Sequence, residues 1–440
     1  MSIVMKFGGT SVADTSALSL VLNIVRKQHA ATGGMVCVVS ATAGTTNYLL
    51  DLARQCIVPS ASVRTLCTPI RTRHEQIVME LVPPSQQQQA LTSVGEIVGE
   101  LERYCNGMHV LEECTPESLD AVASFGERLS STIITHALLG YGVHATEVSA
   151  TTIIRTDSRF TQARVDMDAT REDCGRVLGP LLQAGTLIVT QGFAGADEQG
   201  RTTTLGRGGS DASAAIIGAA IGAVRIEIWT DVSGVYSADP RLVPTARPIE
   251  TLSFGEIREL ALFGAKVLHP DTIVPAVQSN IPVLIKNTFD EGAKGTVIVG
   301  EANQRGLVHA TSLMRPCTMV TGSRSVLQNV ATMESLRERL LLQGNSCEHG
   351  FLVFHTPDDN VKTSIEVVVA DTSATTSSCE VVVCTGPLAN SGRGVRAITT
   401  SVAELAVSAV VAGASPWSVF VVVASTDALP ALGQLHALTE

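Results

Sequence analysis

Lysine is scarce in this sequence, and net positive charge and long apolar runs are absent. Only six of the 440 residues are lysine, against 25 arginines. The formal net charge of −11 argues against a nucleic-acid-binding surface, which needs an excess of cations facing the phosphates. No run of about 18 consecutive apolar residues occurs, so we expect no transmembrane helix and no membrane partner.

The cysteine and histidine patterns indicate neither a metal site nor a disulfide framework. The ten cysteines are scattered without a C-x-x-C pair, which predicts reduced core thiols and not a disulfide framework or a zinc site. The ten histidines show no close metal-ligand spacing. The chain enters a strand-like segment directly, without a cationic leader and apolar signal core. Together these features predict a cytoplasmic protein without a metal site built from its own side chains.

The length and composition predict more than one globular domain. A chain of 440 residues exceeds one ordinary core, so two or three domains are expected. Because 45% of the residues are hydrophobic and only 17% are charged, each domain can bury a large core.

Two glycine-rich turns carry the strongest chemical signal. The turn 206–211 holds one arginine, one serine and one aspartate, and the small apolar run 212–220 that follows predicts a helix with Ser210 or Asp211 as its N-cap. A second turn, 6–11, follows the short apolar run 3–5. Backbone N–H groups at such turns favour anionic ligands. The pair therefore predicts a site for two anions, or for one phosphate held from both sides.

The first part of the chain alternates apolar runs with helical stretches. We expect buried strands at 3–5, 35–40, 187–190, 225–229 and 281–285. Continuous apolar strands separated by helices predict an α/β fold with a mostly parallel sheet between helices. Ligands of such folds bind beyond the carboxyl ends of the strands, where the glycine-rich turns lie. The Gln-, Glu- and Arg-rich region 57–113 has helical spacing and is expected to be a helical insertion.

The tail after Gly300 has a different pattern, a repeated β-α-β-β unit. The expected elements are strands at 308–314, 318–321, 350–355 and 363–369, a helix at 328–342, then a strand at 380–384, a helix at 395–407 and strands at 408–411 and 418–423. The segment 372–378 is expected to be a polar linker. This repetition predicts tandem ligand-sensing or dimerising modules.

Five motifs occur in an order that resembles one family. They are Lys6-Phe7-Gly8-Gly9-Thr10-Ser11, Ser124-Phe125-Gly126-Glu127, Gly206-Arg207-Gly208-Gly209-Ser210-Asp211, Trp229-Thr230-Asp231 and Phe263-Gly264-Ala265-Lys266-Val267-Leu268-His269-Pro270. As an ordered set they closely resemble aspartate kinases, members of the amino-acid kinase family with C-terminal ACT domains. The resemblance covers about residues 1–300 and, weakly, the rest, and it is nearest to the monofunctional, lysine-sensitive branch.

The resemblance implies phosphorylation of the side-chain carboxylate of L-aspartate by ATP with Mg²⁺. The product, 4-phospho-L-aspartate, is the first intermediate toward lysine (through diaminopimelate), threonine and methionine. The chemistry needs a stabilised γ-phosphate and an acceptor held in line, and a carboxylate acceptor is already ionised at neutral pH. No catalytic base is therefore expected. Lys6 and the amides of Phe7, Gly8 and Gly9 are expected at the β- and γ-phosphates.

The aspartate-binding residues follow from the same resemblance. The planar guanidinium of Arg207 suits the α-carboxylate, and Glu127 suits the α-ammonium. Thr46 and Ser210 are expected beside the substrate, and Asp211 is expected to orient Lys6 or a metal-bound water. From the residues alone, Glu127 could instead be a surface residue paired with Arg128, and Asp211 a plain helix cap.

The expected nucleotide residues follow the strand at 225–229. Beyond the phosphate contacts, the resemblance implies ATP contacts from Thr230, Asp231, Tyr236, Arg241, Lys266 and Val267. The chemistry implies a Mg²⁺ ion at the phosphates, and no metal-ligating residue is assigned from the sequence.

The tail resembles paired ACT domains, which bind amino-acid effectors and build a homodimer or a higher homo-oligomer. We expect a catalytic domain at 1–300 and a regulatory region at 301–440, with ferredoxin-like α+β units at about 315–378 and 379–440. The first unit is expected to lack its second helix. Glu348 lies where the lysine-inhibited branch has an acidic residue, so lysine is the candidate effector.

Two other functions compete with this interpretation. Another amino-acid kinase, acting on glutamate, acetylglutamate, carbamate or UMP, would share the fold but should lack the motifs around Glu127 and Arg207. A catalytically dead amino-acid-sensing regulator would not need intact Lys6, Arg207 and Asp211.

Overall fold

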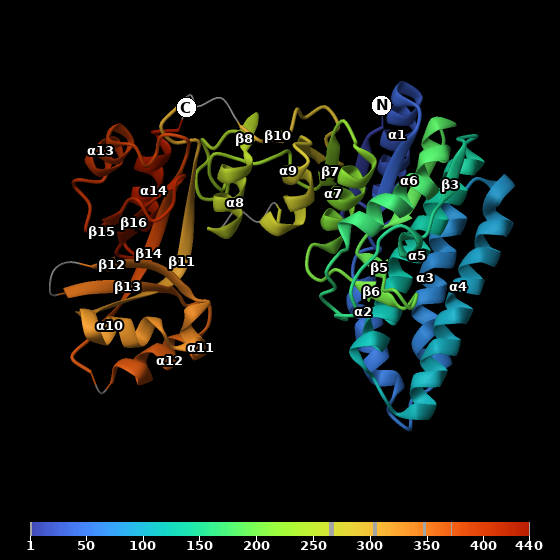
Figure 1. Ribbon diagram of the computed structural model, residues 1–440, viewed down its shortest axis with the longest axis horizontal. Helices are drawn as coiled ribbons and strands as arrows, with labels where there is room; N and C mark the ends of the chain where they lie inside the picture. The colour runs from blue at the N-terminus through green and yellow to red at the C-terminus, as the bar shows by residue number, and fades with distance from the viewer. Residues whose placement is uncertain (1, 264–267, 302–305, 346–348, 371, 440) are drawn as a thin grey trace. The chain divides into compact units, whose positions relative to one another are not determined.

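The computed structural model describes residues 2–263, 268–301, 306–345, 349–370 and 372–439, which form two compact units (Figure 1). The first unit comprises residues 1–234 and 268–300, and the second comprises 235–267 and 301–440. Within the described ranges, no helix is both long enough and apolar enough to cross a membrane.

A mostly parallel sheet forms the centre of the first unit, as expected. Its strands include, in spatial order, β3, β4, β2, β1, β7, β9 and β10. Strand β10 pairs antiparallel with β9, and the pairs from β3 to β9 are parallel. Their bounds are β1 (Val4–Phe7), β2 (Met35–Val39), β3 (Ala145–Glu147), β4 (Leu187–Gln191), β7 (Ile226–Thr230), β9 (Val283–Asn287) and β10 (Thr296–Val299). A separate hairpin pairs β5 (Ala194–Ala196) with β6 (Thr202–Thr204). The chain leaves β1 toward β2 on one side and later returns to β7 on the other, which makes the end of β1 the switch point where ligands bind.

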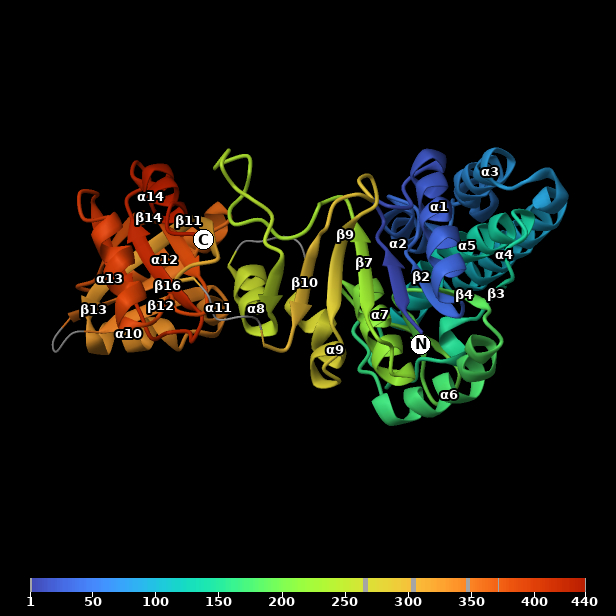
Figure 2. The same ribbon diagram turned by 90° about the horizontal axis from the view of Figure 1, so that it is seen from above.

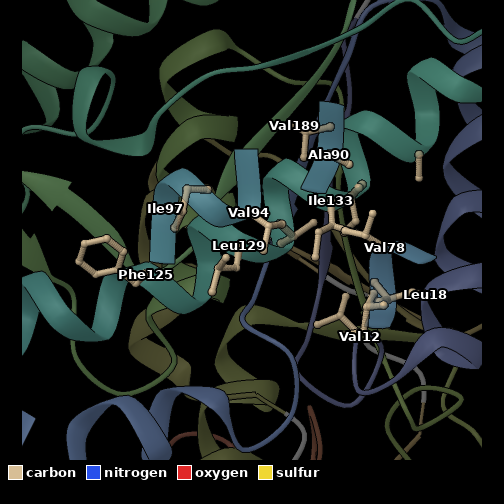
Figure 3. Close-up of a cluster of buried hydrophobic side chains, with 14 of the residues drawn as sticks. Val12, Leu18, Val78, Ala90, Val94, Ile97, Phe125, Leu129, Ile133 and Val189 are labelled. Atoms are coloured by element: carbon tan, nitrogen blue, oxygen red, sulfur yellow. The ribbon is translucent and has the colours of Figure 1, made fainter. Parts of the chain in front are cut away.

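Helices cover both faces of this sheet (Figure 2). They are α1 (Thr15–Thr32), α2 (Thr45–Cys56), α3 (Val63–Leu81), α4 (Pro84–Leu111), α5 (Pro116–Gly140), α6 (Met167–Gln183), α7 (Gly209–Ile221) and α9 (Val274–Gln278), with short 3₁₀ turns at Ala150–Thr152 and Pro270–Ile273. Long helices α3 and α4 confirm the predicted helical insertion. The apolar sides of α3, α4 and α5 meet at Val78, Val94, Leu129 and Ile133, and β4 adds Val189 to the same core (Figure 3). This core fixes one side of α5 and leaves its other side available to the ligand site.

The second unit contains an antiparallel sheet in the order β12-β13-β11-β14-β16-β15. The strands are β11 (Ala310–Ser323), β12 (Leu340–Asn345), β13 (His349–His355), β14 (Thr375–Thr385), β15 (Val407–Val411) and β16 (Ser418–Val423). The helices are α8 (Phe254–Leu262), α10 (Arg324–Ala331), α11 (Glu334–Arg337), α12 (Asp359–Val369), α13 (Gly392–Ser401) and α14 (Ala428–His436), and β8 spans Thr251–Ser253. The β-α-β-β repetition is therefore confirmed as ferredoxin-like α+β architecture.

The predicted elements of the first tail module were partly wrong. Residues 363–369, where a strand was expected, belong to helix α12. The expected helix 328–342 is instead the end of α10 at Ala331, the short helix α11 and the start of strand β12. The Asp358 carboxylate accepts a hydrogen bond from the N–H of Val361 at 3.0 Å and starts α12. Ile365 and Val369 then face the core one helical turn apart. The second helix that we expected to be missing is present, and residues 375–378 of the expected linker belong to β14.

The segment 235–267 packs within the second unit. Ala238 and Val243 join a core formed with the second tail module, and the rings of Phe263 and Phe420 meet edge to face at 4.9 Å. Ser237 Oγ lies 2.9 Å from His436 Nε2. This segment therefore belongs structurally with the tail although it precedes it in sequence.

Candidate active site

A cavity of about 380 Å³ lies beyond the ends of β1 and β2, beside the first turn of α7. Six of the residues proposed from the sequence line it: Lys6, Gly9, Thr46, Glu127, Ser210 and Asp211. They come from β1, its following turn, α2, α5 and α7. The structure thus brings together motifs that lie more than 200 positions apart in the chain.

Lys6 and Asp211 form an ion pair at one wall of the cavity. The Nζ of Lys6 lies 2.5 Å from Oδ1 of Asp211, and both side chains are largely buried. Lys6 shares a face of the sheet with its register partners Val38 and Ile228, and its contact with Asp211 shows that this face is toward α7. This contact places Asp211 where the orienting role expected of it toward Lys6 requires it to be. Neither Ser210 nor Asp211 caps the helix, since the N-cap is Gly208 and no side-chain cap bond forms.

The loop 206–211 is shaped by glycine. Gly206 and Gly208 have φ values of 74° and 73°, a conformation that costs other residues strain. Gly192, after β4, lets this loop approach closely, because a Cβ there would lie 2.6 Å from the Cβ of Ser210. Arg207 is exposed, between two glycines that line the cavity.

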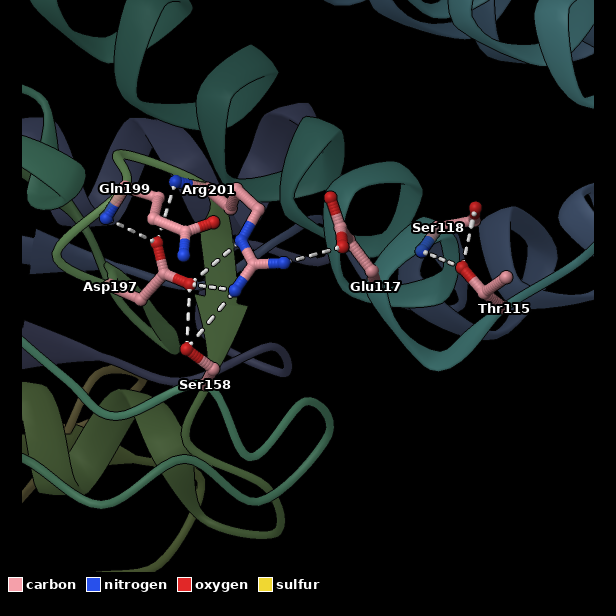
Figure 4. A network of polar contacts seen from close by, with 7 residues as sticks. All are labelled: Thr115, Glu117, Ser118, Ser158, Asp197, Gln199 and Arg201. Carbon is pink, nitrogen blue, oxygen red and sulfur yellow. Dashed lines mark hydrogen bonds and ion pairs between the residues drawn. The ribbon is translucent and has the colours of Figure 1, made fainter.

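Polar contacts anchor the hairpin that leads into this loop. Asp197 accepts hydrogen bonds from Arg201 Nε and Ser158 Oγ, both at 2.9 Å, and Arg201 also pairs with Glu117 of α5 at 3.1 Å (Figure 4). On the same helix, Asp120 accepts a bond at 2.8 Å from the N–H of Thr204. The first turns of α5 therefore hold the hairpin two residues before the loop begins.

Glu127 is a buried carboxyl group in the cavity wall. It is 3% exposed, and burial raises its pKa to about 8, an effect that the N–H of Ala41 partly offsets. Its Oε2 atom has no hydrogen-bond partner among the described residues. Arg128 pairs with Glu100 at 2.6 Å instead, so the interpretation of Glu127 as a surface partner of Arg128 is wrong. Among the residues that the structure describes, no ion pair involves Glu127, so this buried acid is suited to an incoming ammonium group.

Close packing brings Glu127 to the loop that follows β2. A Cβ on Gly126 would lie 2.8 Å from the Cβ of Ala41 and 3.2 Å from Cγ2 of Thr45, so only glycine lets α5 come this near. Helix α2 starts after Gly44, which has a φ of 78° and gives no side-chain cap. The partly buried Thr46 lies in the first turn of α2 and faces the cavity.

The turn after β1 uses one of its amides internally. The N–H of Gly8 donates to the carbonyl of Trp229 at 3.1 Å, and its carbonyl accepts from Ser11 N at 2.9 Å. Gly9 is the residue of this turn that lines the cavity, while the side chain of Phe7 is buried and stacks on Trp229 with centroids 5.8 Å apart. An anion at this turn would therefore meet Gly9 before Gly8.

The proposed nucleotide residues fall into three groups. Thr230 ends β7 and donates to the exposed Asp231 at 3.0 Å, at the carboxyl edge of the sheet. Tyr236 and Arg241 belong to the second unit, where Arg241 pairs with Asp239 at 2.7 Å. Lys266 and Val267, and the effector candidate Glu348, lie outside the described residues.

Other residues of the wall were not proposed from the sequence, among them Ser40, Thr42, Asn47 and Phe193. Ser40, directly after β2, and Phe193, after β4, both line the cavity. Phe193 has a φ of 71°, a left-handed conformation that is strained for a residue with a side chain, and its N–H donates to Ser213 Oγ at 2.9 Å. Ser40 and Phe193 could have been proposed from the sequence because both lie at or just after the carboxyl end of a predicted strand, where ligands of such folds bind.

The donor set fits a metal that arrives with phosphate. The described residues contain no group of three or more His, Cys, Asp or Glu side chains arranged for a metal ion. Mg²⁺ is commonly held by one or two carboxylates together with substrate phosphates and waters, and Asp211 supplies one carboxylate in the cavity.

Comparison with known proteins identifies relatives over most of the chain. Residues 1–287 match the amino acid kinase family. The chain is 36% identical over 381 residues to the lysine-sensitive aspartokinase 3 of Escherichia coli, an alignment that covers 86% of this chain and 79% of that protein. It is 36% identical over 302 residues to an aspartokinase of Chlamydia trachomatis, covering 69% of this chain and 65% of that one. Among solved structures, E. coli aspartokinase III in complex with lysine and aspartate aligns with a TM-score of 0.86 at 30% identity, covering 100% of this chain and 99% of that chain.

Proposed function

Because this chain belongs to the amino acid kinase family and, within it, to the aspartokinases, we propose that it transfers the γ-phosphoryl group of ATP to the side-chain carboxylate of L-aspartate. The products are 4-phospho-L-aspartate and ADP, in the first step toward lysine, threonine and methionine. One observation carries the proposal: a single cavity holds the Lys6–Asp211 ion pair and, in another wall, the buried acid Glu127. This arrangement suits a phosphate on one side and an amino acid on the other.

Aspartate is recognised at both of its α-substituents. Glu127 accepts the α-ammonium, which replaces the missing cation beside this buried carboxyl group. Arg207 forms two parallel hydrogen bonds to the α-carboxylate, with Thr46 and Ser210 beside the substrate. The side-chain carboxylate then points toward Lys6. Since this acceptor is ionised at neutral pH, the enzyme positions it and needs no base.

Lys6 supplies the positive charge that stabilises the phosphoryl group as it is transferred. Asp211 orients its ammonium through their contact at 2.5 Å, and Gly9 offers the backbone on the phosphate side. In this proposal Phe7, Gly8, Thr230, Asp231, Tyr236, Arg241, Lys266 and Val267 complete the ATP site. Mg²⁺, when bound with the nucleotide, neutralises charge on the β- and γ-phosphate oxygens.

The tail regulates the kinase in this proposal. We assign catalysis to residues 1–300 and regulation to residues 301–440, in units of about 315–378 and 379–440. The ferredoxin-like architecture and the similarity to a lysine-sensitive aspartokinase support lysine as the effector, with Glu348 as partner of its ε-ammonium. The working assembly is a homodimer or a higher homo-oligomer.

The reaction is tested with purified protein, ATP and Mg²⁺. Aspartate-dependent ADP release and trapping of the acyl phosphate with hydroxylamine are expected. Glutamate, acetylglutamate, carbamate and UMP serve as competing acceptors. Turnover of one of these without turnover of aspartate would overturn the assignment, and no turnover of any acceptor would favour a dead regulator.

A further inference from the structure

Two adjacent residues of the helical insertion reach both loops of the candidate active site. They are Arg73 and His74 of α3, and neither lines the cavity. The two loops are the β1–α1 loop, residues 8–14, and the β2–α2 loop, residues 40–44, which follow neighbouring parallel strands.

Arg73 joins the two loops through their backbones. Its Nη1 donates to the carbonyl of Ala43 at 2.8 Å, and its Nη2 donates to the carbonyl of Ala13 at 3.0 Å. Ala43 lines the cavity, and Asp14, next to Ala13, caps α1. The planar guanidinium presents its N–H groups in a rigid fork, so it sets the separation of the two carbonyls.

His74 orients a hydroxyl of the cavity wall. The ring is fully buried, with Nδ1 2.8 Å from the carbonyl of Ile70 and Nε2 3.4 Å from Oγ1 of Thr42. A carbonyl only accepts, so Nδ1 carries the proton. Burial lowers the pKa of His74 to about 4, which keeps the ring neutral and leaves Nε2 as an acceptor.

The direction of the hydrogen-bond chain follows. The hydroxyl of Thr42 donates to Nε2 of His74, and the hydroxyl of Thr45 donates to Oγ1 of Thr42 at 2.6 Å. Thr42 lines the cavity, and Thr45 precedes Thr46 at the start of α2. The orientation of these hydroxyls thus depends on a ring that belongs to α3.

We propose that Arg73 and His74 are positioning residues, through which the helical insertion holds the phosphate-side and aspartate-side loops in the geometry needed for binding. The inference rests on the proposed function, because it assigns the β1–α1 loop to ATP and the β2–α2 loop to aspartate. His74 acts on the aspartate side through Thr42, and Arg73 acts on both sides.

The test compares KM values for each substrate. Arg73→Met should raise the KM of both ATP and aspartate by about three- to tenfold, and Arg73→Lys should recover part of the loss. Arg71→Met is the matched control, since Arg71 lies on the same helix and pairs with Glu102 at 3.2 Å. It should leave both KM values unchanged.

For His74, a mutant cycle separates positioning from folding. His74→Leu should raise the aspartate KM about tenfold, with the ATP KM within about twofold, because the Thr42 hydroxyl loses its acceptor. His74→Gln, whose amide can both donate and accept, should restore it. In a Thr42→Val background, His74→Leu should have no further effect.

Equal KM effects of His74→Leu in both backgrounds would overturn the role of His74. Lower thermal stability with unchanged KM values in the Arg73→Met protein would overturn the role of Arg73. Because Arg73 is only half-buried, this variant keeps the proposal testable if the His74→Leu protein fails to fold. Wild-type protein without aspartate-dependent ADP release would instead count against the proposed function.

Discussion

The buried carboxyl group of Glu127 should make aspartate binding depend strongly on pH. The α-ammonium of aspartate binds to ionised Glu127, yet burial holds the pKa of the free enzyme's Glu127 at about 8. Below pH 8 the protein must therefore lose this proton before aspartate binds. The apparent aspartate KM is the intrinsic value divided by the fraction of Glu127 that is ionised. This relation predicts that the KM falls about 25-fold between pH 6.5 and pH 8.5.

The assay is ADP release at saturating ATP, with aspartate varied at each pH. Glu127→Gln should have a high aspartate KM and no such pH dependence, because the amide does not ionise. Glu117→Gln is the matched control: it removes a half-buried carboxylate of the same helix that does not line the cavity, and it should keep the wild-type profile. A flat wild-type KM across this range, or a Glu127→Gln protein with wild-type KM, would refute the reasoning.

Three further predictions follow from the same cavity and from the tail. Lys6→Ala should lower kcat far more than it raises the aspartate KM, whereas Arg207→Ala should change both kcat and KM. Each variant should lose about 2–4 kcal/mol of transition-state stabilisation. Steady-state kinetics in which Arg207→Ala keeps a wild-type aspartate KM would contradict the role of Arg207. Gly126→Ala should destabilise the fold by about 1–3 kcal/mol in urea unfolding and raise the aspartate KM, because the added methyl meets Ala41 at 2.8 Å; unchanged stability would show that α5 can retreat at no cost. Lysine should inhibit the kinase, with a coupling free energy of about 1–3 kcal/mol between the effector and active sites, and threonine should not inhibit it. Glu348→Ala should weaken inhibition by lysine. Activity that is insensitive to millimolar lysine would exclude lysine as the effector.

The sequence predicted the first unit well because its signals are local and strong. Continuous apolar runs mark β2 and β4, and glycines mark the turns beyond the strands. The contact between Lys6 and Asp211 could be anticipated because both follow from the motif order. The pKa of Glu127 could not be anticipated, since it depends on how closely Gly126 lets α5 approach Ala41.

The tail was harder because propensity and burial disagree there. The run of β-branched residues in 361–369 favours a strand, yet Val361, Ile365 and Val369 recur at helical spacing after a capping aspartate. In β12 the opposite conflict occurs: the intrinsic preference of leucines 340–342 is for a helix, but their pairing with β13 makes them a strand. In both cases tertiary contacts outweighed intrinsic preference.

The discontinuous second unit has a consequence for dissecting the protein. A fragment ending at Gly300 would keep the segment 235–267 but lose its packing partners, among them Phe420 and His436. Ala238, Val243 and Phe263 would then face water on a piece of chain that also carries Tyr236 and Arg241. Such a fragment should aggregate or bind nucleotide poorly for reasons unrelated to the chemistry of its cavity. Truncation therefore cannot measure what the tail contributes to catalysis, and point substitutions within an intact chain can.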